Sequence, residues 1–256
     1  MTLTPTAPQG AGEPEAPPAS WRTLPLQVAG ARALLDEGVR LLENLANEPL
    51  PVLRWYIATH TTIVLGRGQA RDLHAASTAE VEVLTRFSGG GAVLMDRDLL
   101  TLDVLLPADH PLLDGDLGAV FLRIGTAWAQ ALSELGVPDV AVHRDAGTAR
   151  RRGDDRERLL AAVCYATIGR GEVLAGGRKL LGLAQRRRRT GALVQCGLLR
   201  RWTPGPLLRA LGAPSQDPEI EAAAVGLDDL SIPGGPVSNE AVMAAVERRL
   251  ATAMRG

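Results

Sequence analysis

The sequence predicts an α/β or α+β fold in which helices flank a mixed β-sheet. Two long segments, residues 28–46 and 117–135, carry apolar side chains at helical spacing. Several shorter apolar runs have the length of strands, and they do not alternate regularly with the helices, as an all-parallel sheet would require. Hydrophobic residues make up 46% of the 256 residues, which is enough for a sizeable core.

The first half of the chain is expected to contain one helix and three strands. Residues 28–46 form the helix, because their apolar side chains recur every three or four positions. Residues 52–57 and 62–65 form two strands joined by a turn. The apolar run at 99–106 (LLTLDVLL) forms a further strand in a buried sheet.

The second half begins with the helix at 117–135, for which Asp116 is the expected N-cap and Gly136 the expected stop. Residues 146–158 carry many charges and no apolar periodicity, so they are expected to form a mobile loop. The remaining expected elements are strands at 161–168, 171–175, 178–184 and 192–199, a hairpin turn at Gly176–Gly177, helices near 206–211 and 218–225, and a last helix from Ser238 to about residue 253.

The N-terminal segment 1–19 differs from the rest of the chain in composition. It is rich in Pro and Ala, and it lacks the basic start and the long apolar stretch of a signal peptide. We expect a disordered tail there, followed by a single compact domain over residues 20–256. No apolar run reaches the roughly 18 residues that span a bilayer. Without a signal peptide, a cytoplasmic protein is expected. The net charge of −1 gives no general attraction to nucleic acid or membranes.

Lysine is almost absent from this chain. Of its 28 basic residues only Lys179 is a lysine, and all the others are arginine. A compact ammonium and a broad guanidinium differ most at a crowded site, so Lys179 is a candidate for a position where arginine does not fit. Chance is the alternative explanation.

A glycine triplet marks the first candidate site. In the segment RFSGGGAV, residues 86–93, the three glycines allow a close backbone approach to a ligand, and successive N–H groups can form an anion-binding concavity. Arg86 and Ser88 could add hydrogen-bond donors. The alternative is a simple turn between strands.

The second candidate site combines a strand with a cysteine. The segment GRKLLGLAQ, residues 177–185, follows a tight turn and would hold Lys179 rigidly, whereas the alternative is a solvated surface hairpin. Cys164 lies 15 residues before Lys179, and a cysteine beside a cation can act as a nucleophile. A buried structural cysteine is the commoner case, and we assign Cys196 to the core.

Taken together, these segments resemble the biotin/lipoate protein ligase family. Its lipoate branch has an Arg-x-Ser/Thr-Gly-Gly-x-Ala-Val loop followed by a Gly-Lys/Arg-Lys-x-x-Gly-Ser-Ala-Gln strand, which residues 86–93 and 177–185 match in order. The Asp-Glu helix and the Gly-x-x-Gln turn of that family are echoed at residues 34–37 and 66–69. The resemblance spans roughly residues 20–250, and it implies the biotin/lipoate protein ligase catalytic-domain fold.

The cysteine-dependent octanoyltransferases are the most similar branch, because they carry a Cys-Phe segment upstream of the lysine strand. Here Cys164-Tyr165 leads through Glu172-Val173 to Lys179 at matching spacing. Several positions depart from the family pattern. Ile168 and Gly169 replace a Pro-Ser, and Gly171 replaces a Tyr. Leu183 stands where Ser is usual, Met95 where a His often follows the glycine loop, and Gln195-Cys196-Gly197 where His-Gly is typical.

The resemblance implies an enzyme of protein lipoylation. An octanoyl or lipoyl group would pass from a carrier-protein thioester to Cys164, and then to a lysine of a lipoyl domain. Lys179 would stabilise the oxyanion, with no cofactor and no metal. The expected substrate-binding residues, around a cleft for a medium-chain acyl group, are Arg86, Ser88, Gly89, Gly90, Gly91, Ala92, Gly182, Ala184 and Gln185.

The expected partners are acyl carrier protein and lipoyl-domain proteins, both binding transiently and both acidic. The run Arg186–Arg189 would form a docking face for them, or else a solvated surface patch. Three alternatives stay open. They are an ATP-dependent lipoate–protein ligase using ATP and Mg²⁺, an amidotransferase acting between lipoyl domains, and a degenerate family member that binds an acyl chain without turnover.

Overall fold

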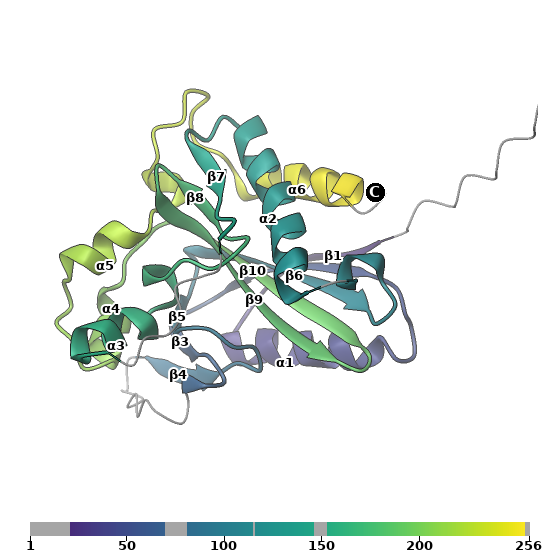
Figure 1. Cartoon of the computed structure of the whole chain (residues 1–256), viewed down its shortest axis with the longest axis horizontal. Coiled ribbons are helices and arrows are strands. Elements are labelled where there is room, and N and C mark those ends of the chain that lie inside the picture. Colours follow the sequence, from purple (N-terminus) through teal and green to yellow (C-terminus); the bar gives the residue numbers. More distant parts are fainter. Residues whose placement is uncertain (1–20, 70–80, 115, 146–152, 254–256) are drawn as a thin grey trace, which may run out of the picture.

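The computed structural model describes residues 21–69, 81–114, 116–145 and 153–253. Two sheets and six α-helices make up the molecule in these ranges (Figure 1). The seven-stranded sheet runs in the order β1 (Arg22–Ala29), β2 (Val52–Ala58), β6 (Leu99–Pro107), β10 (Gly191–Leu199), β9 (Arg178–Arg188), β8 (Val173–Ala175), β7 (Val140–Val142). The three-stranded sheet runs β4 (Glu82–Thr85), β3 (Thr62–Leu65), β5 (Val93–Met95). The helices are α1 (Ala31–Asn44), α2 (Leu117–Glu134), α3 (Asp155–Ala162), α4 (Gly205–Ala210), α5 (Pro218–Ala223) and α6 (Asn239–Ala253).

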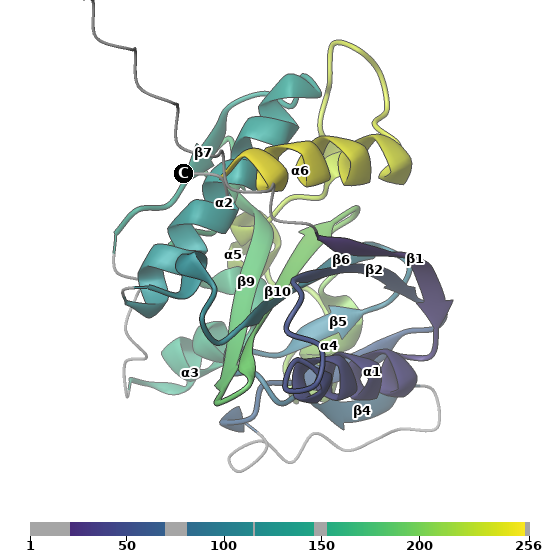
Figure 2. The same ribbon diagram turned by 90° about the vertical axis from the view of Figure 1, so that its right-hand side faces the viewer.

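The large sheet is mixed, as predicted. Strands β1 and β2 are parallel, whereas the other described pairings within this sheet are antiparallel. Helices α2 and α6 cover one face, and α1 with the three-stranded sheet lies on the other (Figures 1 and 2). All nine residues of β6 are buried. The uniform apolar run at 99–106 therefore reflects a central strand that is covered on both faces.

Most predicted elements are confirmed. The strands at 52–57, 62–65 and 99–106 and the helix at 117–135 correspond to β2, β3, β6 and α2. Asp116 caps α2 by accepting a hydrogen bond from the Ala119 N–H. The hairpin turn between β8 and β9 has positive φ angles of 54° and 77° at Gly176 and Gly177, which suits glycine.

Two predictions near the N-terminus are corrected or lie outside the described residues. Residues 22–29 form β1, so the first helix begins at Ala31 and not at residue 28. The strand is hard to detect in sequence because Pro25 interrupts it, and its pairing with β2 shifts register between Leu24 and Gln27. An edge strand tolerates this disruption. The predicted tail at 1–19 lies outside the described residues.

The region before Cys164 is also corrected. The expected strand at 161–168 is absent, because α3 ends at Ala162 and Cys164–Ala166 form one 3₁₀ turn. The predicted loop at 146–158 overlaps α3 at its end, while residues 146–152 lie outside the described part of the chain. Asp154 starts α3 by accepting a hydrogen bond from the Glu157 N–H, a capping pattern within a charged segment. Within the described ranges, no helix is both long and apolar enough to cross a membrane.

Candidate active site

The Cys164 turn is fixed by the glycine segment. The Ala92 N–H donates to the Ala162 carbonyl at 2.7 Å, and the Cys164 N–H donates to the Ala92 carbonyl at 3.0 Å. A Cβ on Gly91 would lie 2.6 Å from the Cys164 nitrogen, so only glycine permits this backbone approach. Gln69 adds a third contact, donating from Nε2 to the Ala162 carbonyl at 2.7 Å. Two of the sequence motifs therefore meet at one turn.

Arg86 holds the glycine loop in place through hydrogen bonds to its backbone. Its guanidinium is buried and donates to the carbonyl oxygens of Gly89 and Gly91, each at 2.8 Å. Gly90 between them has a φ of +102°, which favours glycine. Burial lowers the pKa of Arg86 from its usual range. The structure thus gives Arg86 a role in shaping the loop, and its side chain also lines the cavity described below.

Lys179 is buried beneath Cys164. Its Nζ lies 2.8 Å from the Cys164 carbonyl oxygen, 3.0 Å from the Thr167 carbonyl oxygen and 2.7 Å from Glu172 Oε2. The Cys164 Sγ is 3.9 Å away. An ammonium has three protons, and these three oxygen contacts use all of them. Lys179 therefore supports the turn that carries the thiol, and its charge lies close to the sulfur.

Glu172 is the partner that the sequence analysis did not select. It is buried; Oε2 accepts from the Gly169 N–H at 2.6 Å, and Oε1 accepts from the Leu183 N–H at 3.1 Å. One carboxylate thus joins the Cys164 loop, the lysine and β9. The signal was its match to the family segment between Cys164 and Lys179, seven positions before the lysine, although it was not chosen as a site residue.

An apolar cavity of about 60 Å³ opens beside the Cys164 side chain, which is half-buried. Its walls come from α1, the small sheet and strands β2, β6, β9 and β10. Besides Cys164, the residues that line it include Leu35, Val64, Val93, Met95, Leu99, Gly182, Leu183 and Ala184. Met95, at the position where a His is common in the family, is therefore an apolar wall residue. Lys179 is not among the lining residues.

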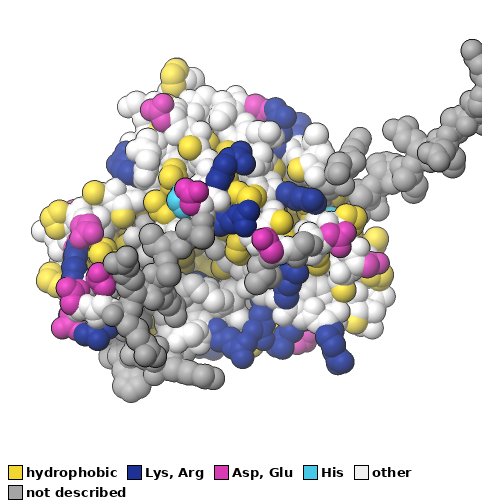
Figure 3. All heavy atoms as spheres, in the orientation of Figure 1, with side chains coloured by type: hydrophobic (Ala, Val, Ile, Leu, Met, Phe, Trp, Pro, Cys, Tyr) yellow, Lys and Arg dark blue, Asp and Glu magenta, His cyan; other side chains and the backbone are white. Residues whose placement is uncertain are grey.

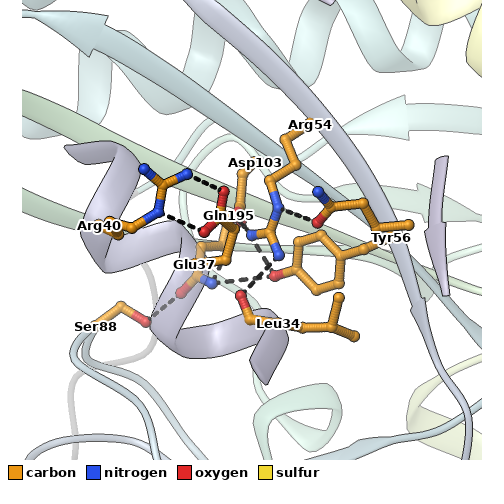
Figure 4. Close-up of polar contacts among 9 residues, drawn as sticks. Leu34, Glu37, Arg40, Arg54, Tyr56, Ser88, Asp103 and Gln195 are labelled. Carbon is orange, nitrogen blue, oxygen red and sulfur yellow. Dashed lines mark hydrogen bonds and ion pairs between the residues drawn. The ribbon is translucent and has the colours of Figure 1, made fainter. Parts of the chain in front are cut away.

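A buried polar network lies at the same cavity (Figure 4). Arg54 and Asp103 are fully buried and form an ion pair at 2.7 Å. The Tyr56 hydroxyl donates to Asp103 at 3.1 Å, and Ser88 Oγ donates to Gln195 Oε1 at 2.7 Å. Burial raises the pKa of Asp103 to about 6, with the Arg54 charge opposing the shift. The hydrogen bond to Gln195 holds Ser88 against strand β10 of the large sheet. This bond uses the hydroxyl proton of Ser88.

Cys196 lies away from this cavity. It is fully buried within the core cluster that packs on α2, and burial raises the pKa of its thiol. The prediction that Cys196 is a core residue is confirmed.

The predicted site residues fall into two neighbouring groups. Cys164, Gly91, Ala92, Gly182 and Ala184 surround the apolar cavity or position its walls. Gly89, Gly90 and Gln185 line an adjoining hollow, together with Ala184. The structure thus brings the three sequence segments together, although Lys179 lies behind the cavity wall.

The chain matches the lipoyl protein ligase A/B catalytic domain over residues 36–248. It belongs to this family. An octanoyltransferase LipM from Moorella thermoacetica is 35% identical over 188 residues, which cover 71% of this chain and 65% of that relative, just under two thirds of its length. An octanoyltransferase LipM from Kyrpidia tusciae is 31% identical over 251 residues, covering 92% of this chain and 87% of the relative.

Solved structures of the lipoyl protein ligase A/B family share the fold. A bipartite lipoate protein ligase from Thermoplasma acidophilum, described with its E2 lipoyl domain, superimposes with a TM-score of 0.60 at 20% sequence identity. The match covers 91% of this chain and 82% of that one. The predicted fold class, a mixed sheet flanked by helices in a lipoate ligase-like arrangement, is confirmed.

Proposed function

We propose that this protein is an octanoyltransferase of protein lipoylation that works through a Cys164 acyl-enzyme. The observation that carries the proposal is the half-buried Cys164 thiol at the wall of an apolar cavity, with the ammonium of Lys179 3.9 Å from its sulfur. The family and the relatives named octanoyltransferase LipM support the activity. The ligase described with its E2 lipoyl domain supports a lipoyl domain as acceptor.

The first step transfers the acyl group to the enzyme. The Cys164 thiolate attacks the carbonyl carbon of a carrier-protein thioester, a new C–S bond forms and the bond to the carrier sulfur breaks. The departing carrier thiolate takes up the proton that Cys164 lost. Because the donor thioester is already activated, this route needs no nucleotide.

The second step transfers the acyl group to the acceptor. The amine of a lipoyl-domain lysine attacks the Cys164 thioester, the amide C–N bond forms and the C–S bond to Cys164 breaks. One amine proton returns to the sulfur, so the enzyme ends the cycle as it began. The two acidic partners visit in turn.

Lys179 acts in this scheme chiefly as a buried charge and a support. Its positive charge near Sγ stabilises negative charge that develops there in both steps. To donate directly to the acyl oxygen, Lys179 would have to release the carbonyl of Cys164 or of Thr167. From its present position, Lys179 can stabilise negative charge on the Cys164 sulfur without entering the cavity.

The cavity walls select the acyl chain. Leu35, Val64, Met95 and Leu99 offer apolar surface to a chain attached at Cys164. Each buried methylene contributes about 0.8 kcal/mol, so about seven of them would dominate the affinity for the acyl group.

Intact-protein mass spectrometry after incubation with octanoyl carrier protein, without ATP, tests the proposal. We expect a gain of one octanoyl group that is lost in Cys164→Ala and kept in Cys196→Ala, which removes the buried thiol on the other face of the sheet. Activity that requires ATP and leaves no adduct would instead indicate a lipoate–protein ligase.

Two further outcomes separate the remaining alternatives. Faster adduct formation from an octanoylated lipoyl domain than from the carrier would indicate an amidotransferase. No adduct and no product under any of these conditions would indicate an acyl-binding protein without turnover.

A further inference from the structure

Three neighbouring hollows share lining residues, each with the next, and we treat them as one path that starts at Cys164. The apolar cavity shares Leu183 and Ala184 with a hollow of about 340 Å³ that also contacts Phe121. That hollow shares Gly89, Gln185 and Arg187 with a third one, of about 680 Å³. The third hollow is also lined by Arg67, Gly68, Phe87 and Arg186. The path therefore leads from the thiol to a basic mouth.

Strand β9 forms the floor of this path. Strand β8 pairs with β9 only between Arg178 and Leu181. Beyond Leu181, β9 pairs with β10 on its other side, and among the described residues no further strand pairs with its free edge. Successive residues from Gly182 to Arg187 consequently line the three hollows in order.

At the mouth, three arginines lie together without an acidic partner among the described residues. Arg67, Arg186 and Arg187 make no ion pair with any residue in the described ranges. Arg186 Nε and Arg187 Nε and Nη2 are shielded from solvent and lack a hydrogen-bond partner there. Burial and the neighbouring charges of Arg188 and Arg67 lower the pKa of Arg186. Figure 3 shows basic side chains along the lower edge of this face, where both α1 and the end of β9 lie in Figure 1.

Unpaired guanidinium groups this close to one another indicate an anionic ligand. Like charges repel, and shielded donors without partners cost free energy, so an anion at this mouth would relieve both effects. The planar guanidinium matches phosphate oxygens in particular. The middle hollow offers a different chemistry, because the side-chain amide of Gln185 is shielded and lacks partners for both its nitrogen and its oxygen. It can donate to and accept from another amide.

We propose that Arg67, Arg186 and Arg187 bind the phosphate of the phosphopantetheine arm that carries the acyl thioester. The inference rests on the proposed function, since it assumes a carrier-bound thioester as donor. The arm lies along β9 with its amides near Gln185 and its thioester at Cys164. The phosphate, and not the surface of the carrier protein alone, provides the recognition at the mouth.

The lengths of the path and the arm agree. Five residues separate Gly182 from Arg187, roughly 16 Å of extended strand at about 3.3 Å per residue. About thirteen covalent bonds join the sulfur to the phosphorus of the arm, roughly 15 Å when extended, because three bonds of an extended chain span about 3.5 Å. An extended arm that starts beside Gly182, at the Cys164 end of the path, is therefore long enough to reach Arg187.

Two small substrates that differ only in the phosphate test this inference. We would measure acylation of Cys164 by octanoyl-pantetheine and by octanoyl-4′-phosphopantetheine. We expect a roughly 10- to 30-fold higher kcat/KM for the phosphorylated substrate, about 1.4–2 kcal/mol of binding, expressed mainly in KM. In Arg186→Gln/Arg187→Gln this ratio should fall close to one. The matched control Arg178→Gln/Arg209→Gln removes two exposed charges elsewhere and should keep the ratio.

Each outcome has a distinct meaning. A ratio near one in the wild type would overturn the inference and leave the Cys164 mechanism standing. A ratio that survives in Arg186→Gln/Arg187→Gln would overturn the assignment to these arginines. Failure of both substrates and of octanoyl carrier protein to acylate the wild type would instead overturn the proposed function. With octanoyl carrier protein as donor, we expect the double variant to raise KM by a similar factor, and high salt to shrink that difference.

Discussion

Two buried ion pairs with the same 2.7 Å separation serve different parts of this protein. Lys179–Glu172 lies under the Cys164 turn, and Arg54–Asp103 lies in the centre of the large sheet. The lysine uses its remaining protons on the backbone carbonyls of Cys164 and Thr167. The comparison shows that the partners of a buried charge, more than its burial, indicate whether it serves a reactive group.

The second pair connects elements of the scaffold. Arg54 donates to the Leu34 carbonyl in α1 and to Gln27 in β1, both at 2.8 Å. Asp103 accepts from the Tyr56 hydroxyl. Removing either pair should destabilise the fold, whereas only the first should alter the chemistry at the thiol.

Replacing each buried cation by the other basic residue should give the largest difference in acyl-transfer rate between the two ion pairs. In Lys179→Arg the longer, planar group meets a crowded site, since a Cβ on the neighbouring Gly182 would already lie 3.4 Å from the lysine Cε. We expect acyl transfer to fall by about 100- to 1,000-fold while the protein stays folded. The reverse exchange, Arg54→Lys, should cost about 2–4 kcal/mol of unfolding free energy and little activity. Single-turnover acylation and urea unfolding would measure both, and near-normal transfer by Lys179→Arg would refute its role.

Replacing the carboxylate of each ion pair by an amide should also separate the pair that serves the thiol from the pair that serves the scaffold. Glu172→Gln leaves the buried Lys179 without its carboxylate, so it should lose about 3–5 kcal/mol of unfolding free energy. Asp103→Asn should lose less at neutral pH, because burial already disfavours the ionised form of Asp103. Glu172→Gln should also slow acyl transfer, because the carboxylate holds Lys179 and the Leu183 N–H in place. Asp103→Asn should change the rate of the folded fraction only slightly. Equal rates for the two variants under conditions where both are folded would contradict the distinction.

The Arg54–Asp103 pair should also make the free energy of unfolding depend on pH. Burial raises the pKa of Asp103 from 3.8 to about 6, so the folded protein binds this proton more tightly than the unfolded chain. Its contribution to the free energy of unfolding is therefore favourable at low pH and is lost as the pH rises from about 4 to about 6, by no more than about 3 kcal/mol. We expect the unfolding free energy of the wild type minus that of Asp103→Asn to decrease over this window in urea titrations. A difference that grows with pH would show the opposite shift.

Two glycine substitutions should give the smallest effects. A Cβ on Gly91 meets the Cys164 backbone at 2.6 Å, so Gly91→Ala should displace the turn, lose about 1–3 kcal/mol and slow acylation. Gly176→Ala places a Cβ in open space but at a φ of +54°, so it should lose roughly 1 kcal/mol and leave the rate unchanged. If thermal unfolding and acylation respond alike in both variants, the proposed positioning of Cys164 by Gly91 is wrong.

The sequence predicted the elements with strong local signals. The helix that Asp116 caps and the hairpin at Gly176–Gly177 are encoded within a few residues, and both are confirmed. The turn at Cys164 was missed because an apolar run of that length fits a strand as well as the end of a helix. What ends the helix and fixes the turn is the backbone of Ala92, which lies 72 positions earlier in the chain.

The candidate site shows the same limit. Motif order was enough to select Cys164, Lys179 and the glycine segment, which the structure brings together. Glu172 was matched by spacing but not selected as a site residue, because its importance comes from the lysine that folds back onto it. The meeting of Arg67 with Arg186 and Arg187 is likewise invisible in sequence, since more than a hundred residues separate them.

The backbone bridge between Ala92 and the Cys164 turn has a consequence for engineering. The two segments share hydrogen bonds in both directions, so the position of the thiol depends on the position of the glycine loop. A glycine loop transplanted from a relative would therefore change the position and orientation of the Cys164 thiol. Exchanging specificity between members of this family therefore requires transplanting residues 86–93 and the end of α3 together, as a matched pair of fragments.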